Sequence, residues 1–514
     1  MSIEMKKLIL PDSAGNEQEF EVIDALMRDT LVTPEMFGAK GDGVSDDTAS
    51  INRCLQNGNK KILFSKSYYI TDSLIVTDNT EIIGSLQGKV ISGINSLKPI
   101  FKCNDCSNIK FDGLIIEGNS QYDAVTDSRD SIEAGLFFGG ECSNISIKNC
   151  KITKCGQAGI FLKSASHVVI DGCYISYLER IPSGFSNGQN YCFGIRTYTS
   201  ITDLKISNTE IFDVAIGVYL THGGSDIEVN NCYVHDITAQ HAFYCATSNF
   251  NIHDCRIDTI LANGINVQYD SSSVVSSDTV IRNNKITDAG NCIAINNIVD
   301  TSIVFTDLLI ENNIFEKSDT ALNCCCVQRL IFKNNIIRLI KRNGIFIVSD
   351  KITKECQFIG NYFYNVAQNE VSGYKYGMQL KYIEDCIVKN NIIISDDAKM
   401  QYGIYATATA TKLKIIGNII KGASTFSFRI DNATTSVEAF DDNVYDLPIN
   451  SQIMNVEGIP TKIFAGNSAP SSGYHSRGEI VYNSAPDTGQ PIGWVCITAG
   501  TVGTWKPFGT ILSS

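Results

Sequence analysis

Two long segments, at 119–134 and 177–192, concentrate carboxylate side chains between short apolar stretches. A protonated carboxylic acid and a carboxylate on either side of a bond can act as general acid and general base. Long loops on a rigid scaffold are also where function is most often found. The candidate catalytic pair is Glu179 from the second segment with Asp127, Asp130 or Glu133 from the first.

A second chemistry is open to residues that follow these segments. Elimination next to a carboxylate group needs a base and a cation that stabilises the developing negative charge. Arg196 could provide the cation. Hydrolysis, elimination and binding without cleavage therefore all remain open. The candidate bases for elimination are Tyr198, Tyr219 and His222.

The stretch at 37–51, FGAKGDGVSDDTASI, also gathers glycines and aspartates, but its spacing indicates structure rather than chemistry. Its glycines run G-x-x-G-x-G, which is not the dinucleotide-binding order, and its aspartates do not alternate as in a calcium loop. The pattern predicts a turn and then a short amphipathic helix that ends near Gly58. Ser45, Asp46 or Asp47 could cap that helix.

The composition is that of a globular protein. Of the 514 residues, 19% are charged and 43% hydrophobic, and the net charge of −13 argues against a nucleic-acid partner. No stretch approaches the roughly 20 apolar residues of a membrane span, and the first residues lack a signal-peptide pattern. We therefore expect folding in a cytoplasm, with the 18 cysteines as thiols. No spacing indicates a metal site, and we expect no cofactor.

From about residue 105 the chain repeats short strand patterns at irregular intervals. Segments such as 145–152, 168–175 and 330–337 alternate apolar and polar residues around an N-N or N-C pair. A second alternating segment, such as 159–164, follows in many units. Two or three short strands per unit, with no room for a helix, predict an all-β, single-stranded parallel β-helix of about 13–14 coils.

One column of the aligned repeats holds only three residue types. The position after the first residue of each pair is Cys or Thr in the early units and Asn in the later ones. Stacked amides can hydrogen-bond their neighbours up and down a ladder of strands, so we interpret this column as structural. The seven asparagines are Asn284, Asn313, Asn335, Asn361, Asn391, Asn418 and Asn443.

A column of aromatic and basic side chains is predicted on the outer face of the second alternating strand, because successive side chains point to opposite faces. Both long segments leave the same corner beside it, about 10 Å apart if a coil rises about 4.8 Å. Aromatic faces and charges suit an oligosaccharide, whereas an exposed apolar strip can also be a subunit interface. The candidate binding residues are Phe137, Phe161, Lys163, Arg196, Tyr198, Tyr219, His222 and Tyr244.

The motif at 37–51, followed by β-coils, resembles the pectate-lyase-like right-handed β-helix proteins of phage tails, the tailspikes and tail-fibre depolymerases. The resemblance covers about residues 33–445. It implies a homotrimeric receptor-binding protein on the virion tail that recognises and depolymerises a bacterial surface polysaccharide, by hydrolysis rather than as a lyase. A non-cleaving or structural fibre and a cellular pectate-lyase-like enzyme are the alternatives. No polygalacturonase signature is complete, so no catalytic residue is carried over.

The same resemblance suggests four parts of the chain. Residues 1–32 resemble the N-terminal segments by which tail proteins attach to a phage tail or baseplate protein. The β-helix with its N-terminal cap is expected at 33–445 and a linker at 446–465. Residues 466–514 hold both tryptophans and are similar to small C-terminal β-modules of phage tail proteins.

Overall fold

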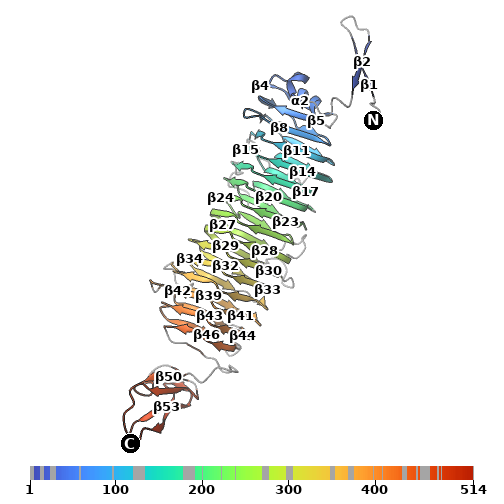
Figure 1. Cartoon of the computed structure of the whole chain (residues 1–514). Coiled ribbons are helices and arrows are strands. Elements are labelled where there is room, and N and C mark those ends of the chain that lie inside the picture. The colour runs from blue at the N-terminus through green and yellow to red at the C-terminus, as the bar shows by residue number, and fades with distance from the viewer. Residues whose placement is uncertain are drawn as a thin grey trace.

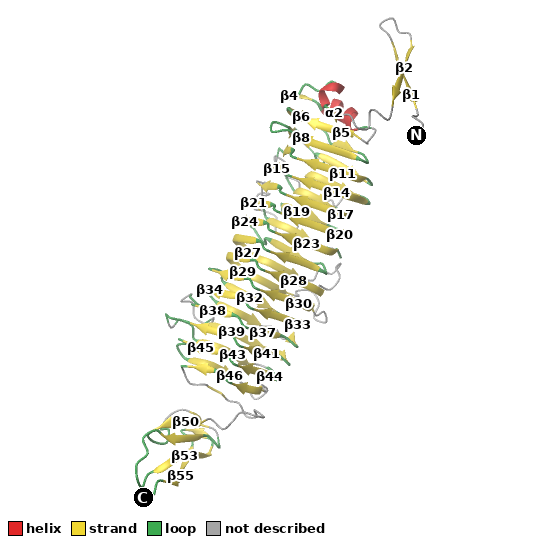
Figure 2. Ribbon diagram, viewed as in Figure 1, coloured by secondary structure: helices red, strands yellow, loops and turns green. Residues whose placement is uncertain are grey.

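The computed structural model is a parallel β-solenoid of about 13 turns (Figure 1), which confirms the predicted all-β class. Its strands stack one above another along a single long axis (Figure 2). The structure describes residues 5–11, 17–23, 31–56, 60–94, 96, 98–119, 133–176, 192–199, 201–221, 223–237, 239–268, 277–296, 305–347, 353–368, 375–397, 399–407, 409–430, 437–446, 450–451, 463–471, 474–475 and 477–512.

Each turn contributes three short strands, and each strand pairs in parallel with its counterparts in the turns before and after. In one turn these are β14 (Cys142–Lys148), β15 (Lys151–Thr153) and β16 (Ala158–Leu162). They pair with β17 (Ala165–Asp171), β18 (Tyr174–Ser176) and β19 (Phe193–Thr197) of the next turn. The three stacks are called the first, second and third ladder.

The corner between the first and second ladder explains the Asn, Asp or Gly that opens each repeat pair. Asn149, Asn208 and Asn231 adopt φ values of 52°, 50° and 50°, and Gly172 adopts 63°. Glycine reaches this left-handed region without a steric penalty, and Asn and Asp tolerate it better than other residues. The Asn, Asp or Gly of each repeat is therefore explained by the left-handed backbone conformation that the corner requires.

The asparagine column forms the predicted ladder in the solenoid interior. The Asn335 Oδ1 accepts hydrogen bonds from the backbone N–H and the Nδ2 of Asn313, at 2.9 and 3.0 Å. Its own Nδ2 donates to the Oδ1 of Asn361 at 3.0 Å and to the backbone carbonyl of Ile310 at 3.1 Å. Every donor and acceptor of this fully buried amide is thus satisfied.

The predicted N-terminal helix is present as α2 (Thr48–Leu55), which lies at the first end of the solenoid (Figure 1). Its Ile51, Cys54 and Leu55 are buried in the main core. The Asp46 Oδ1 accepts the first helical N–H at 3.0 Å, whereas Asp47 binds the backbone N–H of Lys40 at 2.7 Å. The acidic motif is therefore local scaffolding that closes an otherwise open apolar end.

Smaller sheets flank the solenoid in the chain. Strands β1 (Met5–Pro11) and β2 (Glu17–Ile23) pair antiparallel. Towards the C-terminus, β52 (Ile480–Asn483), β53 (Pro491–Thr498) and β55 (Thr504–Thr510) form an antiparallel sheet, to which β50 (Ile463–Gly466) adds in parallel. Among the described residues, no helix is long and apolar enough to cross a membrane.

Replacing Asn361 by Ala should lower the free energy of unfolding by about 1–3 kcal/mol, because neighbouring amide groups would lose their partners in the core. Denaturant unfolding monitored by circular dichroism would measure the loss. Asn230→Ala is the matched control, since Asn230 is a half-exposed strand residue outside the column. Equal stability of the two variants would contradict a structural role for the column.

Candidate functional site

The outer face of the third ladder carries the predicted aromatic and basic column in the predicted register. Phe137 of β13 (Ala134–Gly139) lies opposite Phe161, which lies opposite Arg196. Arg196 lies opposite Tyr219 of β22 (Ile216–Leu220), and Tyr219 opposite Tyr244 of β25 (Phe243–Cys245). Five successive turns therefore place these side chains side by side.

The expectation that all five are exposed is wrong for the first two. Phe137 is 6% exposed and Phe161 is fully buried. Their ring centroids lie 5.4 Å apart. They belong to a second apolar cluster outside the main core, which also takes in residues of a neighbouring outward column. These phenylalanine faces consequently stabilise the solenoid and are not free to stack on a ligand. The other buried members are Ala134, Ala158, Phe193 and Ile216.

Arg196 joins this buried cluster to the more exposed tyrosines. Its guanidinium carbon lies 4.7 Å from the ring centroid of Phe193, 5.2 Å from that of Phe161 and 5.9 Å from that of Tyr219. The Tyr219 and Tyr244 rings stack with centroids 4.6 Å apart. Arg196, Tyr219 and Tyr244 are half-buried and form what we call the aromatic–arginine patch. A cation and ring faces in one patch suit the hydroxyl groups and apolar faces of sugars.

Glu133 stands directly before β13, at the corner between the second and third ladder. It is 6% exposed, and burial raises the pKa of its carboxyl group to about 7, although a hydrogen bond from the Gly156 N–H acts in the opposite direction. A Cβ at Gly156 would lie 2.1 Å from the Glu133 Oε2, so a larger residue there would displace the carboxyl group from its present position. Glu133 thus holds a proton near neutral pH, as a general acid must.

His241 is a candidate that the sequence analysis missed. It lies at the same corner, two residues before β25, and its ring centroid is 5.9 Å from that of Tyr244. Burial lowers the pKa of the imidazole to about 4, so the ring is neutral at physiological pH. Its Nδ1 is buried and has no hydrogen-bond partner among the described residues. The segment around it departs from the second alternating pattern of the repeat, so the periodicity of the sequence did not indicate it.

Both insertions leave the solenoid at the corner that Glu133 occupies. One follows β12 (Ile115–Glu117) and the other follows β18, and β15 pairs with both strands, so the insertions are two turns apart as predicted. Tyr198 packs against the second apolar cluster, and the Lys163 side chain is half-exposed. The remaining predicted residues, Asp127, Asp130, Glu179 and His222, lie outside the described residues.

A family model described as the right handed beta helix region matches residues 55–241, 134–305 and 269–442. The chain belongs to this right-handed β-helix family. The predicted handedness and fold are therefore confirmed. Among curated proteins, no sequence match was found.

Solved β-helix structures resemble the chain in fold. The N-terminal fragment of gene product 12 of bacteriophage phi29 has a TM-score of 0.54 at 11% identity, covering 84% of this chain and 74% of that chain. A double mutant of the tailspike protein of E. coli bacteriophage HK620, solved in complex with a pentasaccharide, has a TM-score of 0.52 at 12% identity, covering 84% and 81%. At these identities the likeness concerns the fold alone.

The β-helix also constrains what chemistry the site could perform. Within the described part of the chain, no group of three or more His, Cys, Asp or Glu side chains is placed to hold a metal ion. Of the described residues near the corner, Glu133 and His241 could move a proton, and Arg196 offers a fixed positive charge. Among the described residues, the arrangement thus provides one acid, one neutral base and one cation, spread over five successive turns.

Replacing Phe161 by Ala should destabilise the protein by about 3 kcal/mol, because a fully buried ring is removed from the second cluster. Thermal or denaturant unfolding would measure this loss. Phe346→Ala is the matched control, since Phe346 occupies the same column farther along the third ladder and is half-exposed. A loss no larger than that of the control would contradict the buried role of Phe161.

Proposed function

We propose that the chain is a phage tail protein that binds a bacterial surface polysaccharide and cleaves it by hydrolysis. The observation that carries this proposal is Glu133, a carboxylic acid with a pKa of about 7 at the corner before the third ladder, two turns from Arg196 of the aromatic–arginine patch. The phage proteins with the same fold support it, one of them a tailspike solved with a pentasaccharide. The cellular pectate-lyase-like alternative has no comparable support.

In the proposed binding mode, the polysaccharide lies along the third ladder over the aromatic–arginine patch. The half-buried Tyr219 and Tyr244 offer aromatic surface to the apolar faces of sugar rings. Arg196 is held in place by the rings around it, so its guanidinium is oriented before the ligand arrives, which reduces the entropy lost on binding. Successive turns rise by about 4.8 Å, and this spacing lets one chain contact several turns.

In the proposed reaction, Glu133 donates its proton to the leaving glycosidic oxygen, and a second carboxylate activates a water molecule. Glu179 is the proposed base, since it follows the end of β18 by three residues in the sequence. Asp127 and Asp130 are its alternatives on the first insertion. Insertions two turns, about 10 Å, apart are near the wide carboxylate separation of inverting enzymes, so we infer inversion of the anomeric centre.

A second candidate reaction is elimination next to a sugar carboxylate, and the specific observation that favours it is the neutral His241 imidazole. Because its pKa is about 4, the His241 imidazole is unprotonated at neutral pH, as a base must be, but it is a weaker base than an ordinary histidine. Arg196 would then stabilise the negative charge that develops on the substrate. Elimination leaves a new double bond that absorbs ultraviolet light, whereas hydrolysis does not, so the products distinguish the two reactions.

The proposed assembly follows the resemblance to phage tail proteins. We propose a homotrimer on the virion tail, attached to a tail or baseplate protein through residues 1–32. Residues 33–445 would then present the polysaccharide site, followed by the linker at 446–465 and the C-terminal module at 466–514.

Replacing Glu133 by Gln should abolish cleavage of the host polysaccharide and leave binding unchanged, because the amide cannot donate the required proton. In the wild-type protein the cleavage rate should fall as pH rises through about 7, where Glu133 loses its proton. Product size on gel filtration would measure the rate. The control is Glu141→Gln, which alters an exposed glutamate after β13. Normal cleavage by Glu133→Gln would exclude Glu133 as the acid.

The same substitution has a predicted effect on stability. The folded-state pKa of Glu133 lies above the ordinary value of 4.5, so the wild-type protein should lose stability as pH rises from about 4.5 to about 7. Glu133→Gln should remove this part of the pH dependence, which thermal unfolding at several pH values would detect.

Replacing Tyr219 by Ala should weaken polysaccharide binding about tenfold, because a stacking surface is lost, whereas Tyr219→Phe should retain most of the affinity. Isothermal titration calorimetry would compare the two variants. If the patch is instead a subunit interface, Tyr219→Ala would dissociate the oligomer in light scattering. That outcome would contradict the proposed binding surface.

A further inference from the structure

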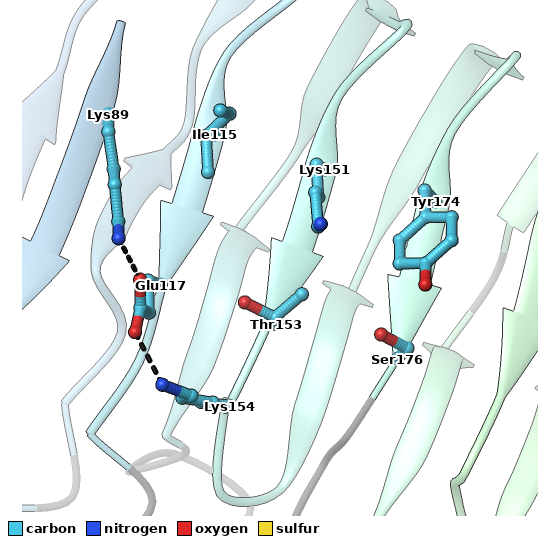
Figure 3. A pocket seen from close by; sticks show the side chains of 8 residues that line it. All are labelled: Lys89, Ile115, Glu117, Lys151, Thr153, Lys154, Tyr174 and Ser176. Carbon is cyan, nitrogen blue, oxygen red and sulfur yellow. Dashed lines mark hydrogen bonds and ion pairs between the residues drawn. The ribbon is translucent and has the colours of Figure 1, made fainter. Parts of the chain in front are cut away.

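A polar hollow of about 390 Å³ lies on the second ladder, on the other side of the insertion corner from the aromatic–arginine patch. It is formed by the outward side chains of four successive strands: β9 (Lys89–Ser92), β12, β15 and β18. Figure 3 shows these side chains on the same face of the ladder. The lining residues are Lys89, Ile115, Glu117, Lys151, Thr153, Lys154, Tyr174 and Ser176.

The hollow has an excess of positive charge. Glu117 lies between two lysines, pairing with Lys89 and accepting a hydrogen bond from the Lys154 Nζ at 2.6 Å (Figure 3). The third lysine, Lys151, holds its Nζ 5.0 Å from the centroid of the Tyr174 ring. No ion pair involving Lys151 occurs among the described residues. Three ammonium groups thus face one carboxylate, in a protein whose net charge is −13.

Groups that recognise sugars surround this charge. Thr153 and Ser176 lie on the same column as Glu117, and neither hydroxyl has a hydrogen-bond partner among the described residues; Thr153 is half-exposed, whereas Ser176 is 4% exposed. The half-exposed Tyr174 ring offers an aromatic face beside Lys151. One anionic group, several hydroxyls and one apolar ring face would satisfy this set, and an acidic sugar residue carries all three.

An aromatic track continues from the hollow along the second ladder, over β21 (Glu210–Phe212) and β24 (Tyr233–Ile237). The Tyr174 ring centroid lies 5.0 Å from that of Phe212, which stacks on His235 at 4.8 Å. His235 in turn stacks on Tyr233 at 4.0 Å. These rings are half-buried, and they extend the surface by about 10 Å, because β24 lies two turns beyond β18 and each turn rises about 4.8 Å.

The track itself carries no excess of positive charge. His235 contacts the carboxylates of Glu210 at 3.2 Å and Asp236 at 2.7 Å. Arg256, which lies over the Tyr233 ring at 4.6 Å, pairs with Asp258 at 3.2 Å. The positive excess is therefore confined to the hollow. A ligand with a negative charge on every unit, such as a nucleic acid, would place most of its charges along a track that does not attract them.

We propose that this face is a second polysaccharide-binding surface, specific for a chain with spaced acidic sugars. One sugar carboxylate lies in the hollow against Lys151, and the following neutral sugars stack along Tyr174, Phe212 and Tyr233. The inference rests on the proposed function in that its ligand is a surface polysaccharide, but it does not depend on cleavage. A polysaccharide bound both here and on the third ladder would pass over the corner at which both insertions occur.

The test measures binding of the full-length protein to uronic-acid-containing capsular polysaccharides and to the same polymers after chemical reduction of their carboxyl groups. Wild-type protein should bind at least one acidic polymer about tenfold more tightly than its reduced form. Lys151→Gln should remove that preference, and Lys151→Glu should weaken binding of the acidic polymer further. Lys421→Gln, at an exposed position far along the same ladder, is the matched control and should behave as wild type.

The outcomes separate this inference from the proposed function. If the wild-type protein binds acidic and reduced polymers equally, or Lys151→Gln retains the preference, the acidic-sugar surface is excluded while polysaccharide binding stands. If Tyr219→Ala weakens binding but the Lys151 variants do not, recognition takes place on the third ladder alone. That result would also exclude the acidic-sugar surface. If single-stranded DNA binds as tightly as the acidic polymer, the specificity is for polyanions and the inference is wrong. Binding of none of the polymers would overturn both proposals.

Discussion

Parallel backbone hydrogen bonding between successive turns is the constraint on which the rest of this protein depends. Each strand is held in register by the turns above and below, so a residue's place in its repeat fixes its column. A column then behaves as one surface, although its members are widely separated in the chain. Recognition on such a scaffold needs only one suitable side chain per turn, repeated or varied from turn to turn.

The interior and exterior use this register in opposite ways. Inside, the Asn column keeps one residue type over its later turns, because a buried amide such as Asn335 must meet the same partner in each neighbouring turn. Outside, the columns change type: the third ladder runs from Phe137 through Arg196 to Tyr244, and the second from Lys151 through Tyr174 to Tyr233. Repeated residues in the interior stabilise the solenoid, whereas the change of residue type along an outer column determines what that face can bind.

The sequence could predict the features that depend only on the spacing and alternation of residues in the repeats. The strands, the Asn335 column, the register of Phe161 with Arg196 and the shared corner of the insertions all follow from alternation and spacing. The burial of Phe161 could not be predicted from the strand pattern. Phe161 is covered by a second outward column that includes Phe193, and the pattern does not pair Phe193 with Phe161. The raised pKa of Glu133 depends on its burial at the corner, which the sequence pattern does not reveal. The lysine hollow combines side chains from four turns, and no local motif marks it.

The backbone at the corner between the second and third ladder differs between the early and the middle turns of the solenoid. In the early turns it opens into the two insertions, whereas β27 (Arg256–Gln268) and β29 (Lys285–Asn296) run through it as continuous strands, with a register shift between Ile260 and Asn263. An unbroken strand leaves no point at which extra residues can be added without disrupting pairing. Extra residues are therefore accommodated more easily at the early corners than in the middle of the solenoid, which makes those corners the natural places for grafting a new loop.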